Sequence, residues 1–133
     1  MKYMLDTNIC IYLIKKKPQK RLQKFKQFEL SQLGISSITF GELLYGVYKS
    51  SEITQNKLAL AQFVTPLEIA PYNDEAADYY GKVRTFLEKR GTPIGSLDML
   101  IAAHALSLGC ILVTNSVKEF SRIPNLKIEN WAK

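Results

Sequence analysis

The sequence predicts an α/β fold in which helices accompany a mostly parallel sheet. Short apolar runs typical of strands alternate with longer stretches in which apolar residues recur every three or four positions, as on one helix face. The run Cys110–Val113 is apolar throughout, as expected for a parallel strand buried on both faces. The 133 residues contain no repeat and no long linker, so we expect a single domain over residues 1–133.

The first half of the chain is expected to form two strands and several helices. Phe40, Leu43 and Val47 have the spacing of an amphipathic helix, and Pro18 ends an earlier helix that begins near Ile9. In chain order we expect a strand at Tyr3–Leu5, that first helix, a basic helix around Leu22 and Phe25, a strand at Leu33–Ser36, the helix around Phe40 and a helix over Ser51–Val64.

Capping residues mark the helices of the second half. Asn73 is expected to begin a helix whose first turn carries two acids, where the helix dipole favours them, and which ends near Gly91. Ser96 is expected to cap the next helix, and Gly109 closes it where a left-handed residue is needed. Strands are expected at Leu67–Ile69, Cys110–Val113 and Leu126–Ile128.

The charge of the chain favours a polyanionic partner. The formal net charge is +6, and the segment Lys15–Lys26 holds seven basic residues and no acid. Such a run suits nucleic acid, an acidic protein or a membrane surface, although a solvated helix face explains the run taken alone more simply. The two sparse cysteines fit a reducing cytoplasm, and no apolar run approaches the roughly 18 residues that span a bilayer. We expect a cytoplasmic protein.

Four acids occupy comparable places in the predicted pattern. Asp6 follows the first strand, Glu42 lies in the helix after the second, Asp98 begins a later helix, and Glu119 follows the strand Cys110–Val113. Ligands of open parallel sheets collect outside the carboxyl ends of the strands. If the four carboxylates meet there, their oxygens suit Mg²⁺ or Mn²⁺.

Each acid also has a purely structural explanation. Asp6 suits a helix cap, Asp98 suits a helix first turn, and both Glu42 and Glu119 complete an S/T-x-x-E capping box. Short polar residues beside the acids suit either a supporting shell around a metal or ordinary turn and cap chemistry. These residues are Thr7, Asn8, Thr114, Asn115 and Ser116.

Other catalytic chemistries find little support in the sequence. His104 is the single histidine and lies on the apolar stripe of its helix, which favours a buried core residue over a general base. With no second histidine and no cysteine beside it, a nucleophilic triad or a histidine-pair ribonuclease is excluded. There is also no glycine-rich phosphate loop.

Four separated blocks of the chain resemble PIN domains, and more closely the VapC-type bacterial toxins. The resemblance covers essentially the whole chain, in the family's order. Its blocks are Met4-Leu5-Asp6-Thr7-Asn8, Ile38-Thr39-Phe40-Gly41-Glu42-Leu43-Leu44-Tyr45-Gly46, Thr92–His104 and Val113–Ile123 with Asn130-Trp131.

The resemblance implies a three-layer α/β/α fold and metal-dependent endoribonuclease activity. It places metal coordination on Asp6 and Asp98, then on Glu42. Glu119 is the only acid available in the last block, because Asn115 and Ser116 are uncharged. It also implies a cognate VapB-like antitoxin, operator DNA bound only through the antitoxin complex, a homodimer, and an RNA substrate that in some relatives is transfer RNA.

The expected reaction is magnesium-assisted hydrolysis of RNA phosphodiesters that leaves a 5′-phosphate and a 3′-hydroxyl. Two other classes remain open at this point. A non-catalytic binding module is one, although such a module has no need to keep every acid. A magnesium-dependent phosphatase is the other, although Asn8 stands where that class carries a second aspartate.

Overall fold

The computed structural model describes residues 1–15 and 29–131. Two expectations lie outside the described residues. They are the basic helix around Leu22 and Phe25 and all of the basic run Lys15–Lys26 except Lys15. The elements are β1 (Tyr3–Leu5), α1 (Thr7–Lys15), the 3-10 helix η1 (Leu30–Gln32), β2 (Leu33–Ser36), α3 (Ser37–Tyr48), α4 (Ile53–Val64), β3 (Glu68–Ala70), α5 (Asp74–Lys89), α6 (Ser96–Leu108), β4 (Ile111–Val113), α7 (Val117–Phe120) and β5 (Ile128–Glu129).

The five strands form one sheet in the order β3-β2-β1-β4-β5, and every neighbouring pair is parallel. The expected mostly parallel sheet is confirmed. β1 lies in the centre, where Tyr3 is in register with Leu33 of β2 and with Ile111 of β4. The chain moves from β1 to one edge and later to the other, so a topological switch point lies at the carboxyl end of β1. Such points are where open parallel sheets bind ligands.

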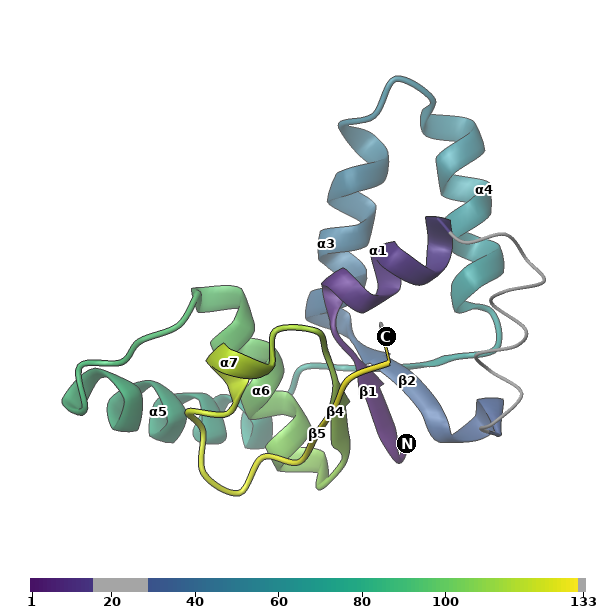
Figure 1. Ribbon diagram of the computed structural model, residues 1–133. Coiled ribbons are helices and arrows are strands. Elements are labelled where there is room, and N and C mark those ends of the chain that lie inside the picture. The colour runs from purple at the N-terminus through teal and green to yellow at the C-terminus, as the bar shows by residue number, and fades with distance from the viewer. Residues whose placement is uncertain (16–28, 132–133) are drawn as a thin grey trace.

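Helices cover both faces of the sheet, which gives the three layers seen in Figure 1. Alternate residues of β1 serve the two faces: Tyr3 and Leu5 pack with α1, α3 and α4, whereas Met4 packs with α5 and α6. This alternation follows from the two-residue period of a strand. Because both faces are covered, β1 and β4 are apolar throughout, and in β2 the single polar residue is Ser36 at its carboxyl end. Among the described residues no helix is long and apolar enough to cross a membrane.

Most strand and helix limits lie within two residues of those expected from the sequence. β2 has the expected limits, while β3 and β5 begin one and two residues later than expected. The expected cap at Ser96 is wrong, because α6 begins at Ser96 itself and Gly95 occupies the cap position without a side-chain bond. Asn73 caps α5 as expected, through its bond from the Ala76 amide. Gly109 closes α6 at φ +65°.

Candidate functional site

Asp6 joins β1 to α1 at the centre of the sheet. Its backbone N–H donates to the Val113 carbonyl of β4 at 3.0 Å, so this residue continues the strand pairing. Its side chain accepts from the Ile9 N–H at 2.8 Å and thereby caps α1. The carboxyl group is 3% exposed. The capping role expected for Asp6 is confirmed, and it holds the carboxylate at the end of β1 in a fixed direction.

Three of the expected acids influence one another electrostatically. Burial raises the pKa of Asp6, the nearby charge of Asp98 raises it further, and hydrogen bonds from Thr114 and the Ile9 amide oppose the rise. Burial also raises the pKa of Asp98, and the charge of Glu119 adds to that effect. The fold therefore brings Asp6 of the β1–α1 junction, Asp98 of α6 and Glu119 of α7 into one neighbourhood. Carboxylates in such a place favour a proton or a bound cation.

Glu42 lies on α3, a helix that one hydrogen bond ties to the first turn of α1. The Thr7 hydroxyl, beside Asp6, donates to the Thr39 hydroxyl at 3.2 Å and ties the first turn of α1 to α3. Glu42 follows Thr39 by less than one turn and is half-buried.

Thr114 supports the site from β4. It is fully buried, its hydroxyl bonds to the Asp6 carboxylate, and its oxygen accepts from the Ser116 N–H at 2.9 Å. Asn8 and Asn115 are exposed beside it, and Ser116 is half-buried. Of the expected supporting residues, Thr7 and Thr114 thus have a structural connection to the carboxylates or to α3. The two asparagines face solvent.

The capping boxes offered as structural explanations for two acids are absent. Ser36, and not Thr39, caps α3, through a bond from the Ile38 N–H at 3.1 Å. Ser116 occupies the cap position of α7 but its side chain makes no cap bond. The first turns of both helices therefore do not account for Glu42 or Glu119.

The donor set suits a hard divalent cation that keeps part of its water shell. No group of three histidine, cysteine, aspartate or glutamate side chains within residues 1–15 and 29–131 forms a ready-made ligand cage. Mg²⁺ is usually held by one or two carboxylates together with water and substrate phosphates. A buried Asp6 beside Asp98 provides that arrangement, and the nearby hydroxyl groups suit bound water.

Sequence reasoning missed two polar residues that organise the site. Thr39 was assigned only a capping role, yet it is fully buried and bonded to Thr7. Ser36 caps α3 and also lies 2.7 Å from Nδ1 of His104. A visible signal existed for Thr39, because it shares the buried stripe of Leu43 and Val47.

His104 is a buried structural residue, as expected from its stripe. It is 1% exposed, packs edge-on against Tyr72 at 5.1 Å, and bonds to the Pro71 carbonyl. Burial lowers its pKa, and the Pro71 bond opposes this. The neutral ring therefore donates a hydrogen bond to the Pro71 carbonyl, and its Nδ1 accepts a hydrogen bond from the Ser36 hydroxyl. This network joins β2, the β3–α5 loop and α6 behind the acids.

Comparison with known proteins identifies the family. Residues 3–126 match the family model described as PIN domain. The chain is 47% identical to Ribonuclease VapC2 of Rickettsia felis, with 100% of both chains covered, and 44% identical to the tRNA(fMet)-specific endonuclease VapC of Salmonella typhimurium, with 98% of both covered. Among solved structures, VapBC2 of R. felis bound to a promoter DNA fragment gives a TM-score of 0.92 at 46% identity, covering 98% of this chain and 99% of that one. DNA-bound VapBC of S. typhimurium gives 0.93 at 44% identity, covering 98% of both chains. The chain is thus a PIN-domain protein of the VapC ribonuclease family.

Proposed function

We propose that the chain is a magnesium-dependent endoribonuclease, the toxin of a toxin–antitoxin pair, and that it acts in the cytoplasm. The observation that carries the proposal is the meeting of Asp6 and Asp98. Asp6 follows the central strand β1, and Asp98 lies much later in the chain, in α6. The charge of Asp98 nevertheless raises the pKa of Asp6. A mutually repelling, partly desolvated pair is an arrangement that a divalent cation stabilises. Divalent-metal dependence is general in this nuclease family.

The four carboxylates share the work in this proposal. Asp6 and Asp98 hold the cation directly, with Glu42 and Glu119 reached directly or through water. Thr7, Asn8, Thr114, Asn115 and Ser116 orient the carboxylates or hold that water. When bound, Mg²⁺ (or Mn²⁺) lowers the pKa of a coordinated water and neutralises charge on the phosphoryl oxygens. The cap bond from the Ile9 amide and the hydrogen bond from the Thr114 hydroxyl keep the Asp6 carboxylate aligned.

The relatives supply the substrate and partners that we propose. Two relatives are named tRNA(fMet)-specific endonuclease, and the similar solved structures include VapBC complexes, two of them bound to DNA. We infer that this chain cuts RNA, with transfer RNA as the first substrate to examine. We also infer that a cognate antitoxin inhibits it, that operator DNA is bound through the antitoxin complex, and that the chain forms a homodimer.

The proposal is tested by RNA cleavage with a matched pair of variants. The purified chain is incubated with total transfer RNA in Mg²⁺, with and without chelator. Asp98→Asn should abolish cleavage, whereas Asp78→Asn, which alters an exposed acid paired with Lys82 on α5, should cut as the parent does. Sequenced product ends should carry a 5′-phosphate and a 3′-hydroxyl. Equal cleavage by the parent and Asp98→Asn would show a contaminating nuclease and favour a non-catalytic binding module.

A further inference from the structure

The α3–α4 hairpin carries two tyrosines on its exposed side. Tyr45 is 61% exposed and Tyr48 is 54% exposed, which is unusual for large aromatic side chains on neighbouring positions of one helix. Lys49 and Lys57 lie beside them. We call these four residues the tyrosine–lysine surface. It takes no part in either buried cluster of the core, so packing does not explain it.

Each lysine of this surface rests on a tyrosine ring. The Lys49 Nζ is 4.9 Å from the centre of the Tyr45 ring. The Lys57 Nζ is 5.4 Å from the Tyr48 ring centre and donates to its hydroxyl at 3.1 Å. Within the part of the chain that the structure describes, neither lysine pairs with an acid. The cations are thus held in place without being neutralised, and both tyrosine side chains remain more than half exposed.

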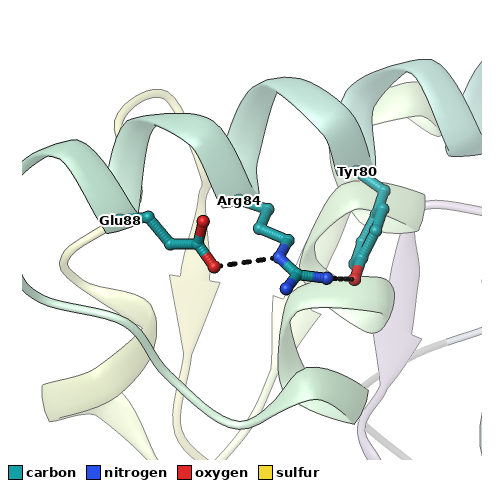
Figure 2. Close-up of polar contacts among 3 residues, drawn as sticks. All are labelled: Tyr80, Arg84 and Glu88. Carbon is teal, nitrogen blue, oxygen red and sulfur yellow. Dashed lines mark hydrogen bonds and ion pairs between the residues drawn. The ribbon is translucent and has the colours of Figure 1, made fainter.

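Two basic residues of α5, Lys82 and Arg84, are paired with acids instead. Figure 2 shows the Arg84 guanidinium between Glu88, whose Oε2 lies 3.0 Å from Nε, and the Tyr80 hydroxyl, 3.0 Å from Nη1. Lys82 likewise lies over the Tyr79 ring but is paired with Asp78 at 3.0 Å. Because acids offset the charges of Lys82 and Arg84, these two residues offer a polyanion less than the tyrosine–lysine surface does.

Helix geometry places part of this surface in line with the candidate site. Tyr45 on α3 and Lys49 at the helical C-cap of α3 follow Glu42 by three and seven residues. At about 100° per residue the three side chains fall within roughly 60° of one another around the helix axis. At about 1.5 Å per residue, Tyr45 lies roughly 4.5 Å and Lys49 roughly 10.5 Å beyond Glu42 along the axis. The Thr7–Thr39 bond fixes the beginning of this stripe beside Asp6.

We propose that the tyrosine–lysine surface binds the single-stranded RNA next to the bond that is cut, with a base stacked on Tyr45 and a phosphate on Lys49. The inference rests on the proposed nuclease function and adds a substrate-binding element to it. Aromatic rings joined to unpaired basic groups are typical of surfaces that bind single strands. Lysine, by contrast, is depleted in the core of protein–protein interfaces. Stacking requires an unpaired base, so the surface selects loops over duplex RNA.

The test measures RNA binding apart from cleavage. Binding of a fluorescein-labelled, unstructured RNA of about 12 nucleotides is followed by fluorescence anisotropy in Mg²⁺. Every protein in this assay also carries Asp98→Asn, so that the RNA is bound but not cut. Tyr45→Ala should weaken binding about tenfold, and Tyr45→Phe should retain it. Lys49→Gln should reduce the salt dependence of binding by about 0.7 in the log–log slope. A duplex of the same RNA should bind with little dependence on Tyr45.

Tyr79→Ala is the matched control, because it removes a tyrosine with the same lysine contact from a different helix. It should leave RNA binding unchanged. In the cleaving protein, Tyr45→Ala should raise KM more than it lowers kcat. Unchanged RNA affinity in Tyr45→Ala overturns the inference, as does a loss that Tyr79→Ala reproduces. If Tyr45→Ala leaves RNA affinity unchanged but lowers the molecular mass measured by light scattering, the surface contacts a second copy of the chain. If it leaves RNA affinity unchanged but weakens antitoxin binding, the surface contacts the antitoxin. If the nuclease proposal is wrong, the parent protein binds RNA without cutting it, and this result is distinguishable from the outcomes above.

Discussion

At the scale of single residues, Asp6 combines two requirements that are usually met by different side chains. One carboxylate oxygen caps α1 through the Ile9 amide, and the same buried group contributes negative charge to the candidate site. The first role needs only an oxygen acceptor, since Asn and Asp are equivalent caps. The second role needs the charge. Substitutions that remove one property and keep the other therefore separate stability from activity.

We predict that Asp6→Asn folds at least as well as the parent in chelator but does not cut RNA. The asparagine oxygen preserves the cap, and the cost of burying a charge disappears. Asp6→Ala also loses activity, but it should be less stable than Asp6→Asn by about 1 kcal/mol because the cap is gone. Urea unfolding of the three proteins gives the order. An alanine variant as stable as the asparagine variant would show that the cap contributes nothing.

His104 should make stability fall in mild acid. Burial lowers its folded-state pKa below the ordinary value of 6.5, so the folded protein favours the neutral ring. Stability is therefore complete above pH 6.5, falls as the unfolded imidazole takes up a proton below it, and levels off below the folded pKa. The loss is about 1.4 kcal/mol for each pH unit between the two pKa values.

The measurement is the free energy of unfolding of the parent and of His104→Gln from pH 7 downward. The difference between the two curves should shrink as the pH falls below 6.5. Because the chain has one histidine, its ring resonance in NMR also reports the folded pKa without ambiguity. A ring that titrates at or above 6.5 would contradict the prediction.

The sequence predicted which acids to examine, but not how they are held. Asp6 and Glu119 could be selected because each follows a predicted strand, and parallel strands share one carboxyl edge. Asp98 could be selected because it begins the helix that leads into the strand Cys110–Val113. That Thr39 would bond to Thr7 depended on how α1 crosses α3. Contacts of this kind arise from tertiary packing, which spacing along the chain does not encode.

At the scale of helices and strands, prediction succeeded where local chemistry decides and failed where packing does. Asn73 and Gly109 end their helices by local hydrogen bonding and by positive φ, and both were identified. β3 and β5 are short strands at the two sheet edges, whose limits follow from partner register rather than from their own residues. The cap of α3 was misplaced because Ser36 and Thr39 are equally suitable by residue type.

Two glycines should respond to alanine in opposite directions. Gly109 has φ +65° and open space where a Cβ would stand, so Gly109→Ala costs about 1 kcal/mol through backbone strain alone. Gly81 lies inside α5, and a Cβ there also meets nothing within 4 Å. Gly81→Ala should therefore stabilise the protein by about 0.5–1 kcal/mol. Thermal unfolding checks both signs, and two shifts in the same direction would contradict the argument.

At the scale of the whole molecule, the two thiols should report on opening of the fold. Cys10 and Cys110 are buried on opposite faces of the sheet. Burial raises the pKa of the Cys10 thiol well above its ordinary value and that of Cys110 to about 11. Alkylation by iodoacetamide should therefore proceed only through opened molecules.

Mg²⁺ at about 100 times its dissociation constant should slow that alkylation about 100-fold in the parent, because only the folded state binds it. Asp98→Asn should show no such protection. Mass spectrometry of each cysteine peptide gives the rates. Rapid labelling of either thiol in the folded protein, or equal protection of both proteins, would disprove the coupling between the site and global stability.

The central position of β1 has a consequence for protein synthesis. The first strand to leave the ribosome acquires its β4 neighbour, and with it the Thr114 hydroxyl on Asp6, only after more than four-fifths of the described sequence has been translated. Asp98 and Glu119 also emerge late. If these carboxylates form the proposed metal site, a nascent chain that has not yet presented β4 and Glu119 has no assembled site, and it should be unable to cut the RNA of the ribosome that is making it.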